Sequence, residues 1–318
     1  MEFVLPFDIP PSPSKISLKQ SVLFAGSCFA SEIGQRMKQQ RFDVCLNPYG
    51  ILYNSESLCG MLMRIAEGRE YQTDNLTEHN GQWFSLDHHG SFKADSADKC
   101  LNLINTALRG AHEKLKQASW LCVTPGSSWV YRLVQNGRTV GNCHKLPSRL
   151  FEKQLLPASD QIQGWEQCIE QLHQFNPSLQ WIFSISPVRY IRDGLAENNV
   201  SKAQLFTTIN HLVYTHEQVH YFPAYELVTD VLRDYRFFKE DMVHPNDLAI
   251  QYVWEKFKAC YFGSREQGLH RQIEDYTRLS GHIVMDASSA GRHQQQLEQR
   301  NEAIEAALQA LRQHALNV

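Results

Sequence analysis

A serine and a cysteine that could act as nucleophiles stand side by side where an apolar run changes into a helical pattern. Ser27 and Cys28 directly follow Gly26, which ends the run. Backbone N–H groups at a helix N-terminus favour negative charge, so they could stabilise an oxyanion or lower the pKa of a thiol. For Ser27, an ordinary N-cap serine is a competing interpretation. Adjacent residues in such a turn point in opposite directions, so we expect one of the two to face a cleft and the other to pack inward.

A serine nucleophile needs a base, and His244 is the best placed of the fourteen histidines. Asp241 precedes it by three residues, so within one loop the carboxylate could orient the imidazole through Nδ1. Pro245 follows and ends the turn before a helical stretch. The competing interpretation is a surface loop in which the two residues are close by coincidence.

A second group of histidines raises the question of a metal site. His88, His89 and His144 accompany Asp87 and Cys143 in the sequence. Their spacing matches no zinc motif, and adjacent histidines in a strand point to opposite faces. We therefore expect neither a metal ion nor a cofactor.

Other polar residues are candidates for substrate contact. Asn142, His144 and Lys145 follow a predicted hairpin that could lie over the strand ends. Arg189 and Arg192 follow another strand and could bind a carboxylate or a phosphate. These arginines could equally be solvated charges at the start of a helix.

The elements that must position these residues alternate between apolar runs and helical patterns. This alternation predicts an α/β fold with a parallel sheet covered on both faces, whose sites lie at the carboxyl ends of the strands. Asn136-Gly137 marks a tight hairpin turn, and residues 69–98 indicate an irregular insertion or a small hairpin. The predicted strands are 16–24, 42–46, 118–126, 179–187 and 219–227, and the predicted helices are 31–40, 55–68, 99–117, 158–175 and 195–216.

The composition is that of a soluble globular protein with a large core. The chain has 318 residues, of which 42% are hydrophobic and 20% charged, and a net charge of −3. The near balance of charges disfavours a nucleic-acid partner. No stretch is typical of an export signal or of a membrane span, so we expect no membrane association. The eight cysteines form no CxxC pair and are expected to be reduced thiols in a cytoplasmic protein.

The last part of the chain differs from the rest in composition. We predict one domain over residues 1–262 and a polar helical extension over 263–318. In the extension, apolar residues recur at intervals of 7, 4, 3 and 4, at Leu297, Ile304, Leu308, Leu311 and Ala315. This seam is short for a coiled coil, which favours a terminal helix packed on its own chain. A homodimer through this helix is the alternative.

The motif Gly26-Ser27-Cys28-Phe29-Ala30 resembles the signature of the GSCFA family, which is placed among the SGNH (GDSL-like) hydrolases. Six further matches occur in order, and together they span roughly residues 1–260. They are Asn47-Pro48-Tyr49-Gly50, Asp87-His88-His89 with Ser91-Phe92, Gly126-Ser127-Ser128-Trp129-Val130-Tyr131, Asn142-Cys143-His144-Lys145, Ser186-Pro187-Val188-Arg189 and Asp241-Met242-Val243-His244-Pro245.

The resemblance implies a three-layer α/β/α sandwich with a mostly parallel, flavodoxin-like sheet, followed here by the C-terminal helical extension. It also implies Ser27 as the nucleophile, in preference to Cys28, and Asp241 and His244 as its acid–base partners. The glycine of the second SGNH block, an oxyanion donor, maps onto Gly50.

The third SGNH block is where the sequence departs from the pattern. The resemblance leads us to expect Gly-x-Asn-Asp, but the matching strand end reads Gly126-Ser127-Ser128-Trp129. The asparagine that donates to the oxyanion is missing, so Asn142 or Ser128 would have to replace it. Loss of one donor of this kind typically costs about 3 kcal/mol of transition-state stabilisation.

The resemblance implies a serine-dependent ester hydrolase or deacetylase acting on an O-acylated small molecule or carbohydrate. An acyltransferase with the same triad and a non-water acceptor is the first alternative. A catalytically silent SGNH-like binding protein is the second, which the altered third block favours.

Overall fold

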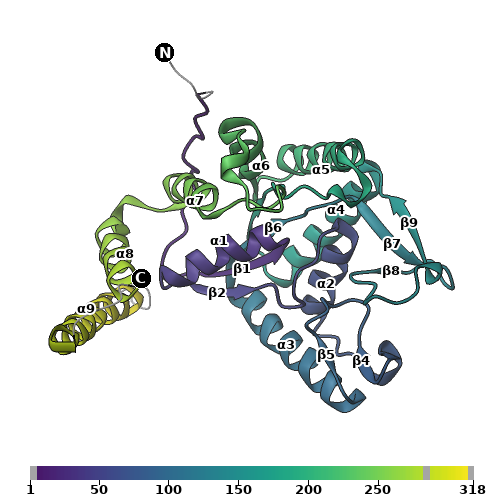
Figure 1. Ribbon diagram of the computed structural model, residues 1–318, viewed down its shortest axis with the longest axis horizontal. Helices are drawn as coiled ribbons and strands as arrows, with labels where there is room; N and C mark the ends of the chain where they lie inside the picture. The colour runs from purple at the N-terminus through teal and green to yellow at the C-terminus, as the bar shows by residue number, and fades with distance from the viewer. Residues whose placement is uncertain (1–5, 282–286, 314–318) are drawn as a thin grey trace.

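A parallel five-stranded sheet forms the centre of the molecule (Figure 1). The computed structural model describes residues 6–281 and 287–313. In the sheet the strands lie in the order β11-β10-β6-β1-β2, and every neighbouring pair is parallel. The strands are β1 (Ser21–Gly26), β2 (Asp43–Leu46), β6 (Ala118–Thr124), β10 (Gln180–Phe183) and β11 (Val219–Tyr221).

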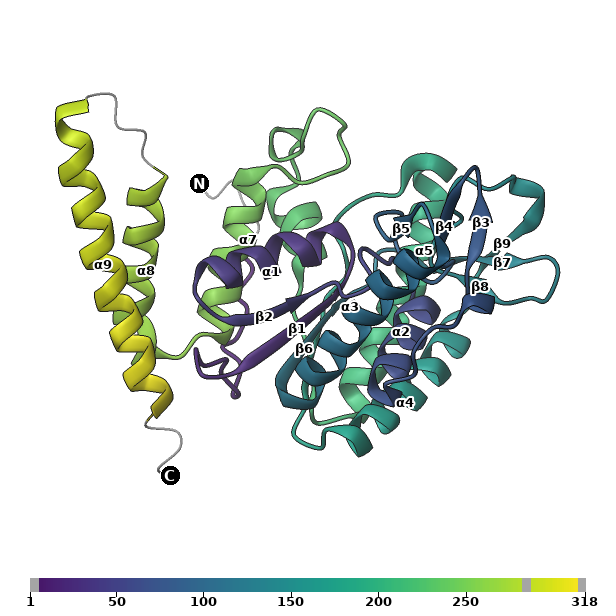
Figure 2. The same cartoon turned by 90° about the horizontal axis from the view of Figure 1, so that it is seen from below.

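Helices cover both faces of this sheet, which makes the predicted three-layer sandwich (Figures 1 and 2). Side chains alternate along a strand, so Leu23 and Ala25 of β1 enter one core, whereas Val22 and Phe24 enter the other. One core is covered by α2 (Ser55–Glu67), α3 (Ala97–Gln117), α4 (Ala158–Phe175) and α5 (Leu195–Thr215). The other is covered by α1 (Cys28–Gln39), α6 (Ala224–Glu226) and α7 (Asp247–Tyr261).

The first strand begins later than the sequence predicts. It starts at Ser21, whereas Ile16 forms an isolated bridge with Phe262. The N-terminal arm pairs with the end of α7, because Ser12 N–H donates to the Cys260 carbonyl and Ile16 N–H to the Tyr261 carbonyl. The apolar residues before Ser21 therefore belong to a packed arm. Periodicity alone could not distinguish this arm from a strand.

Two small antiparallel sheets project from the sandwich at one end (Figure 2). The predicted hairpin at Asn136-Gly137 is present, with Gly137 at φ +69°. A third strand, which the sequence analysis did not include, joins this hairpin. One sheet consists of β3 (Thr77–His79), β4 (Gln82–Phe84) and β5 (Lys93–Ala94), and the other of β7 (Trp129–Leu133), β8 (Thr139–Val140) and β9 (Phe151–Leu155).

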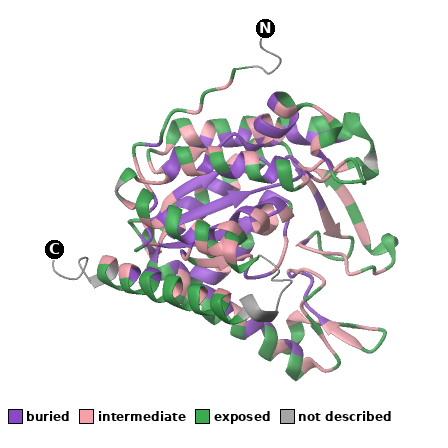
Figure 3. Ribbon diagram, turned by 60° about the vertical axis from the view of Figure 1, so that its left-hand side comes forward, coloured by how far each residue is buried: buried purple, intermediate pink, exposed green. Residues whose placement is uncertain are grey.

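The C-terminal segment forms the helices α8 (Gln267–Ser280) and α9 (Ala287–Gln313), which pack against each other beside the sandwich (Figure 2). Ile304 and Leu308 of the predicted seam are buried within the chain, while most of α9 is exposed (Figure 3). Arg41 links α9 to the sandwich through Asn301, at 2.7 Å. Ala315 lies outside the described residues. A homodimer through this helix and a domain boundary at residue 262 stay predictions.

None of the described helices combines the length with the apolar character that a membrane span requires.

Candidate active site

The carboxyl ends of β1, β6 and β10 meet at one edge of the sheet. Gly26, at the end of β1, allows the backbone there to lie close to Thr124 at the end of β6. A Cβ at Gly26 would lie 2.3 Å from the carbonyl oxygen of Thr124, and its φ is +138°. An L-amino acid rarely adopts this backbone conformation. The Ser27 N–H donates to the same Thr124 carbonyl at 3.0 Å. The turn that carries Ser27 and Cys28 is thus held against the end of β6.

A cavity of about 900 Å³ opens beside this edge. Its walls come from the N-terminus of α1, the β7–β9 sheet and the loops that follow β8 and β10. Residues far apart in the sequence therefore share one space. The predicted site residues that line it are Gly126, Asn142, His144, Arg189 and His244, and Cys28, Lys145 and Arg192 line it as well.

Asp241 and His244 form the predicted pair at the rim of this cavity. His244 Nδ1 lies 2.6 Å from Asp241 Oδ2. The other carboxylate oxygen accepts hydrogen bonds from the backbone N–H groups of Val243 and His244, both at 3.0 Å. Met242 at φ +59° closes the turn.

The protonation of this pair follows from its hydrogen bonds. The backbone N–H groups of His244 and Val243, together with the imidazole, lower the pKa of Asp241 to about 2. An ionised carboxylate is an acceptor only, so Nδ1 of His244 carries the proton and donates it to Asp241. The Nε2 lone pair of His244 is then the group that can act as a base.

Ser27 occupies the N-cap of α1 and is not among the described residues that line the cavity. The residue is 1% exposed, and its Oγ has no hydrogen-bond partner among the described residues. Although Ser27 stands at the N-cap, Oγ makes no capping hydrogen bond either. Half-buried Cys28 does line the cavity. The assignment of Ser27 as the nucleophile stays a prediction.

Opposing effects act on the thiol of Cys28. Burial raises its pKa above the ordinary value. The backbone N–H groups of Phe29 and of Cys28 itself, and the charge of Lys239, act in the opposite direction. Burial prevails, so the resting thiol is protonated at neutral pH.

The two amides expected to hold an oxyanion are both engaged elsewhere. The Gly50 N–H donates to the Asn47 carbonyl at 2.7 Å, and the Ser27 N–H donates to Thr124. Gly50 has φ +73°, and a Cβ there would lie 2.4 Å from the His89 Cβ. Its role in this structure is to form a tight turn. The prediction of these two donors was wrong for this conformation, because the Gly50 N–H is occupied within its own turn and the Ser27 N–H by a carbonyl of β6.

Ser128, one of the two replacements for the missing asparagine, is buried away from the cavity. Its Oγ donates to the Ser201 carbonyl at 2.8 Å and accepts from Gln161 Nε2 at 3.0 Å. The prediction of Ser128 as a donor was therefore wrong. Gly126 lines the cavity, but its N–H donates to the Tyr53 carbonyl at 2.7 Å.

Asn142 remains as the replacement that does line the cavity. Its Oδ1 accepts from the His144 N–H at 2.7 Å, which leaves the side-chain NH₂ as a donor group. His144 serves mainly to anchor the same loop. Its Nε2 lies 3.0 Å from the carbonyl oxygens of both Ser85 and His88, and its ring stacks on Phe84 with centroids 4.2 Å apart.

The cavity wall carries a concentration of positive charge. Lys145, Lys153, Arg189 and Arg192 line it, and none of the lining residues that the structure describes is acidic. The Arg189 guanidinium lies 4.9 Å from the centroid of the Phe238 ring. Its Nη1 is buried and has no acceptor among the described residues. This wall favours a ligand that bears a negative charge.

Lys202 is a structural part of the site that the sequence analysis missed. It is 1% exposed, and its Nζ donates to the carbonyls of Gly126 at 2.7 Å and Ser186 at 2.6 Å. It thereby joins the segments that follow β6 and β10. Burial lowers its pKa to about 7. The sequence did indicate that Lys202 is buried, because it lies at helical spacing from Leu205 and Ile209 on the buried face of α5.

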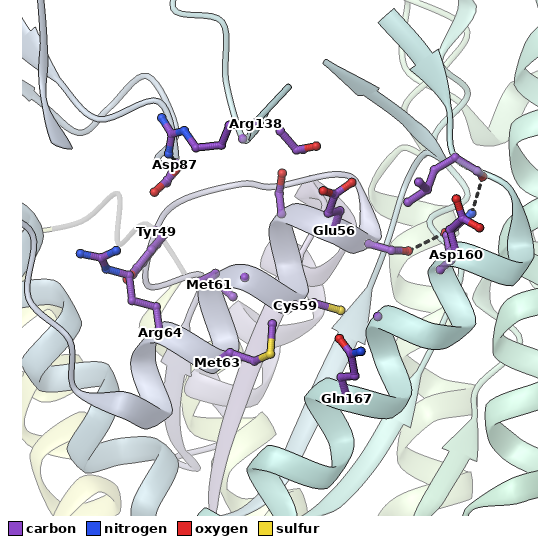
Figure 4. A pocket seen from close by; sticks show the side chains of 18 of the residues that line it. Tyr49, Glu56, Cys59, Met61, Met63, Arg64, Asp87, Arg138, Asp160 and Gln167 are labelled. Atoms are coloured by element: carbon purple, nitrogen blue, oxygen red, sulfur yellow. Dashed lines mark hydrogen bonds and ion pairs between the residues drawn. The ribbon is translucent and has the colours of Figure 1, made fainter. Parts of the chain in front are cut away.

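A second cavity, of about 710 Å³, lies between α2 and α4 (Figure 4). Two ion pairs lie on its lining. Arg138 contacts Asp87 at 2.7 Å, and Arg132 contacts Glu56 at 2.9 Å. Arg64 stacks on a tyrosine ring. The turn at the start of α1 and the Asp241–His244 pair are not among its lining residues.

Comparison with known proteins identifies one family. The GSCFA family model matches residues 21–257. A search of curated proteins found no match. Among solved structures, a family 3 carbohydrate esterase of Clostridium thermocellum is similar over 79% of this chain and 97% of that chain, at 10% identity and a TM-score of 0.33. An acetyl xylan esterase of the rumen bacterium Butyrivibrio proteoclasticus is similar over 79% of this chain, at 13% identity and a TM-score of 0.37, and the similar region spans 64% of that chain.

Proposed function

The chain belongs to the GSCFA family, and from that premise we propose that it is an ester hydrolase that uses Asp241 and His244 as its acid–base pair. One observation carries the proposal. The ordered Asp241–His244 pair opens onto the same cavity as the N-terminus of α1, where a nucleophile stands. A base held by a carboxylate beside a nucleophile is the arrangement that acyl transfer requires.

The proposed reaction follows from the orientation of the imidazole. Because Nδ1 of His244 is engaged with Asp241, Nε2 takes the proton of the nucleophile as it attacks the ester carbonyl. The alkoxide leaves with that proton, and water then releases the acyl group by the same route. The sequence-based prediction places the nucleophile at Ser27. The side-chain NH₂ of Asn142 is the candidate donor to the oxyanion.

The proposed substrate is a small molecule or carbohydrate that carries an O-acyl group and a negative charge. The basic wall of the cavity supports the negative charge, with Arg189 as the residue whose buried Nη1 has no acceptor among the described residues. Trp129 and Tyr190 add apolar surface to the same cavity.

The base is tested by hydrolysis of p-nitrophenyl esters of increasing acyl length. We expect wild-type protein to hydrolyse the short esters, and His244→Ala to lower kcat/KM by roughly 10³-fold or more through loss of the base. His211→Ala is the matched control, because that histidine pairs with Glu166 on the helical surface, away from the cavity. Equal turnover by the wild-type and His244→Ala proteins, or no hydrolysis of any ester, would contradict the proposal.

The charge of the substrate is tested with a matched pair of esters, 4-acetoxybenzoate and its neutral amide. Hydrogen bonds to charged groups contribute about 1.5–3 kcal/mol, so Arg189→Met should raise KM for the anionic ester by roughly tenfold or more. KM for the neutral ester should stay nearly unchanged. Arg189→Lys keeps the positive charge, so it should raise KM for the anionic ester less than Arg189→Met does. An equal change in KM for both esters would show that Arg189 acts through packing.

A further inference from the structure

We propose that Lys202 is a positioning residue for the hydrolysis, because it fixes two loops that form part of the cavity wall. The inference rests on the proposed function and concerns the same site. Nζ of Lys202 donates to the carbonyl of Gly126, after β6, at 2.7 Å and to that of Ser186, after β10, at 2.6 Å. Both of these residues line the cavity, whereas Lys202 is not among the described residues that do. One buried side chain thus connects two loops of the site from outside the cavity.

The first half of α5 carries three buried polar residues that contact these loops. They are Asn198, Ser201 and Lys202, which share one face of the helix. The Tyr190 N–H, in the loop after β10, donates to Asn198 Oδ1 at 2.9 Å, and the Ser128 N–H, after β6, donates to Ser201 Oγ at 2.7 Å. Further along the helix the same face enters the apolar core. Of the three polar residues, Lys202 is the one that contacts both loops.

The burial of an amine at this position has a cost that packing does not explain. No carboxylate among the described residues pairs with Lys202. An apolar side chain would fill the same place at a lower cost in free energy. The carbonyls of Gly126 and Ser186 supply the reason for a lysine, because within residues 6–281 and 287–313 the structure gives neither of them another donor. A buried carbonyl without a donor is itself costly.

The two loops connect Lys202 with the groups that the proposed reaction uses. A Cβ at Gly126 would lie 3.7 Å from the Cβ atoms of both Ser27 and Ser186, so the loop after β6 packs against the turn of the predicted nucleophile. The loop after β10 leads from Ser186 to Arg189, the proposed contact for a negative charge. Without Lys202 both carbonyls would turn toward other donors and the loops would shift. A displacement of about 1 Å in an active site can lower the rate by about 10²-fold.

The experiment compares Lys202→Met and Asn176→Leu in the hydrolysis of short p-nitrophenyl esters. Asn176 is the matched control, because its buried Nδ2 also donates to two carbonyls, those of Leu115 at 2.9 Å and Ala118 at 2.8 Å, at the amino end of β6. Each variant removes the side-chain donor from two carbonyls, so each should lower Tm. Below the unfolding transition, Lys202→Met should lower kcat by roughly 10²-fold with little change in KM, and Asn176→Leu should keep the wild-type kcat.

A wild-type kcat in Lys202→Met would overturn the inference, and so would an equal loss of kcat in Asn176→Leu, since Lys202 would then only stabilise the fold. If Lys202→Met does not fold, a crystal structure of the wild-type protein after reaction with a fluorophosphonate decides the question. Both carbonyls should still contact Nζ in that structure, and the loss of either contact would overturn the inference.

The two proposals can fail separately. If His244→Ala is inactive while Lys202→Met keeps the wild-type kcat, the role of Lys202 is wrong and the hydrolase proposal stands. If the wild-type protein hydrolyses no ester, or if hydrolysis does not depend on His244, the proposed function itself is wrong.

Discussion

Replacing Asp241 by asparagine is expected to lower kcat for ester hydrolysis by roughly 10³–10⁴-fold with little change in KM. Asparagine can keep the turn, because its oxygen still accepts from the N–H groups of Val243 and His244. The NH₂ group would then face His244 Nδ1, at the position now held by Oδ2. A donor there favours the tautomer with the proton on Nε2, which cannot accept a proton from the nucleophile.

The control for this substitution is Asp234→Asn. Asp234 also accepts a backbone N–H in a surface turn, from Arg236 at 2.8 Å, and it does not line the cavity. The Asp234→Asn substitution should therefore leave kcat for ester hydrolysis unchanged. Because the pKa of Asp241 is lowered to about 2, its carboxylate is ionised throughout ordinary assay conditions, and mild acidification does not imitate the substitution through this group. If Asp241→Asn kept wild-type kcat, the pair would have no catalytic role.

Replacing Gly26 by alanine is expected to lower the free energy of unfolding by more than about 4 kcal/mol, or to prevent folding. The added Cβ would lie 2.3 Å from the Thr124 carbonyl oxygen, and the residue would have to keep φ at +138°. Relief of this clash requires β1 and β6 to separate, and they are neighbours in the central sheet. Chemical denaturation followed by circular dichroism measures the loss.

The matched control is Gly60→Ala. Gly60 lies on the exposed side of α2, and a Cβ there would meet no atom within 4 Å. Alanine is a better helix former than glycine, so this variant should gain up to about 1 kcal/mol. A loss below about 1 kcal/mol for Gly26→Ala would show that the turn can adapt.

Much of the fold follows from local sequence patterns. Five apolar runs alternate with helices of regular period, and this alternation is enough to predict a covered parallel sheet. The Asp241–His244 pair also follows from local sequence, because the two residues are three positions apart and one turn brings them together. The Asn136-Gly137 hairpin is local in the same sense. By contrast, the partners of the Ser128 hydroxyl and of the Ser27 N–H lie far away in the sequence, at Ser201 and Thr124.

The sequence by itself determined the sandwich, the edge of the sheet that carries the site and the Asp241–His244 pair. The tertiary structure decided that the Ser27 N–H is engaged, because the Thr124 carbonyl on β6 accepts from it. It likewise placed Lys202 beneath the strand ends, where its Nζ donates to the carbonyls of Gly126 and Ser186. The physical reason is that a hydrogen-bond donor is directed by the acceptor that satisfies it. When that acceptor belongs to another strand or loop, local sequence cannot specify the direction.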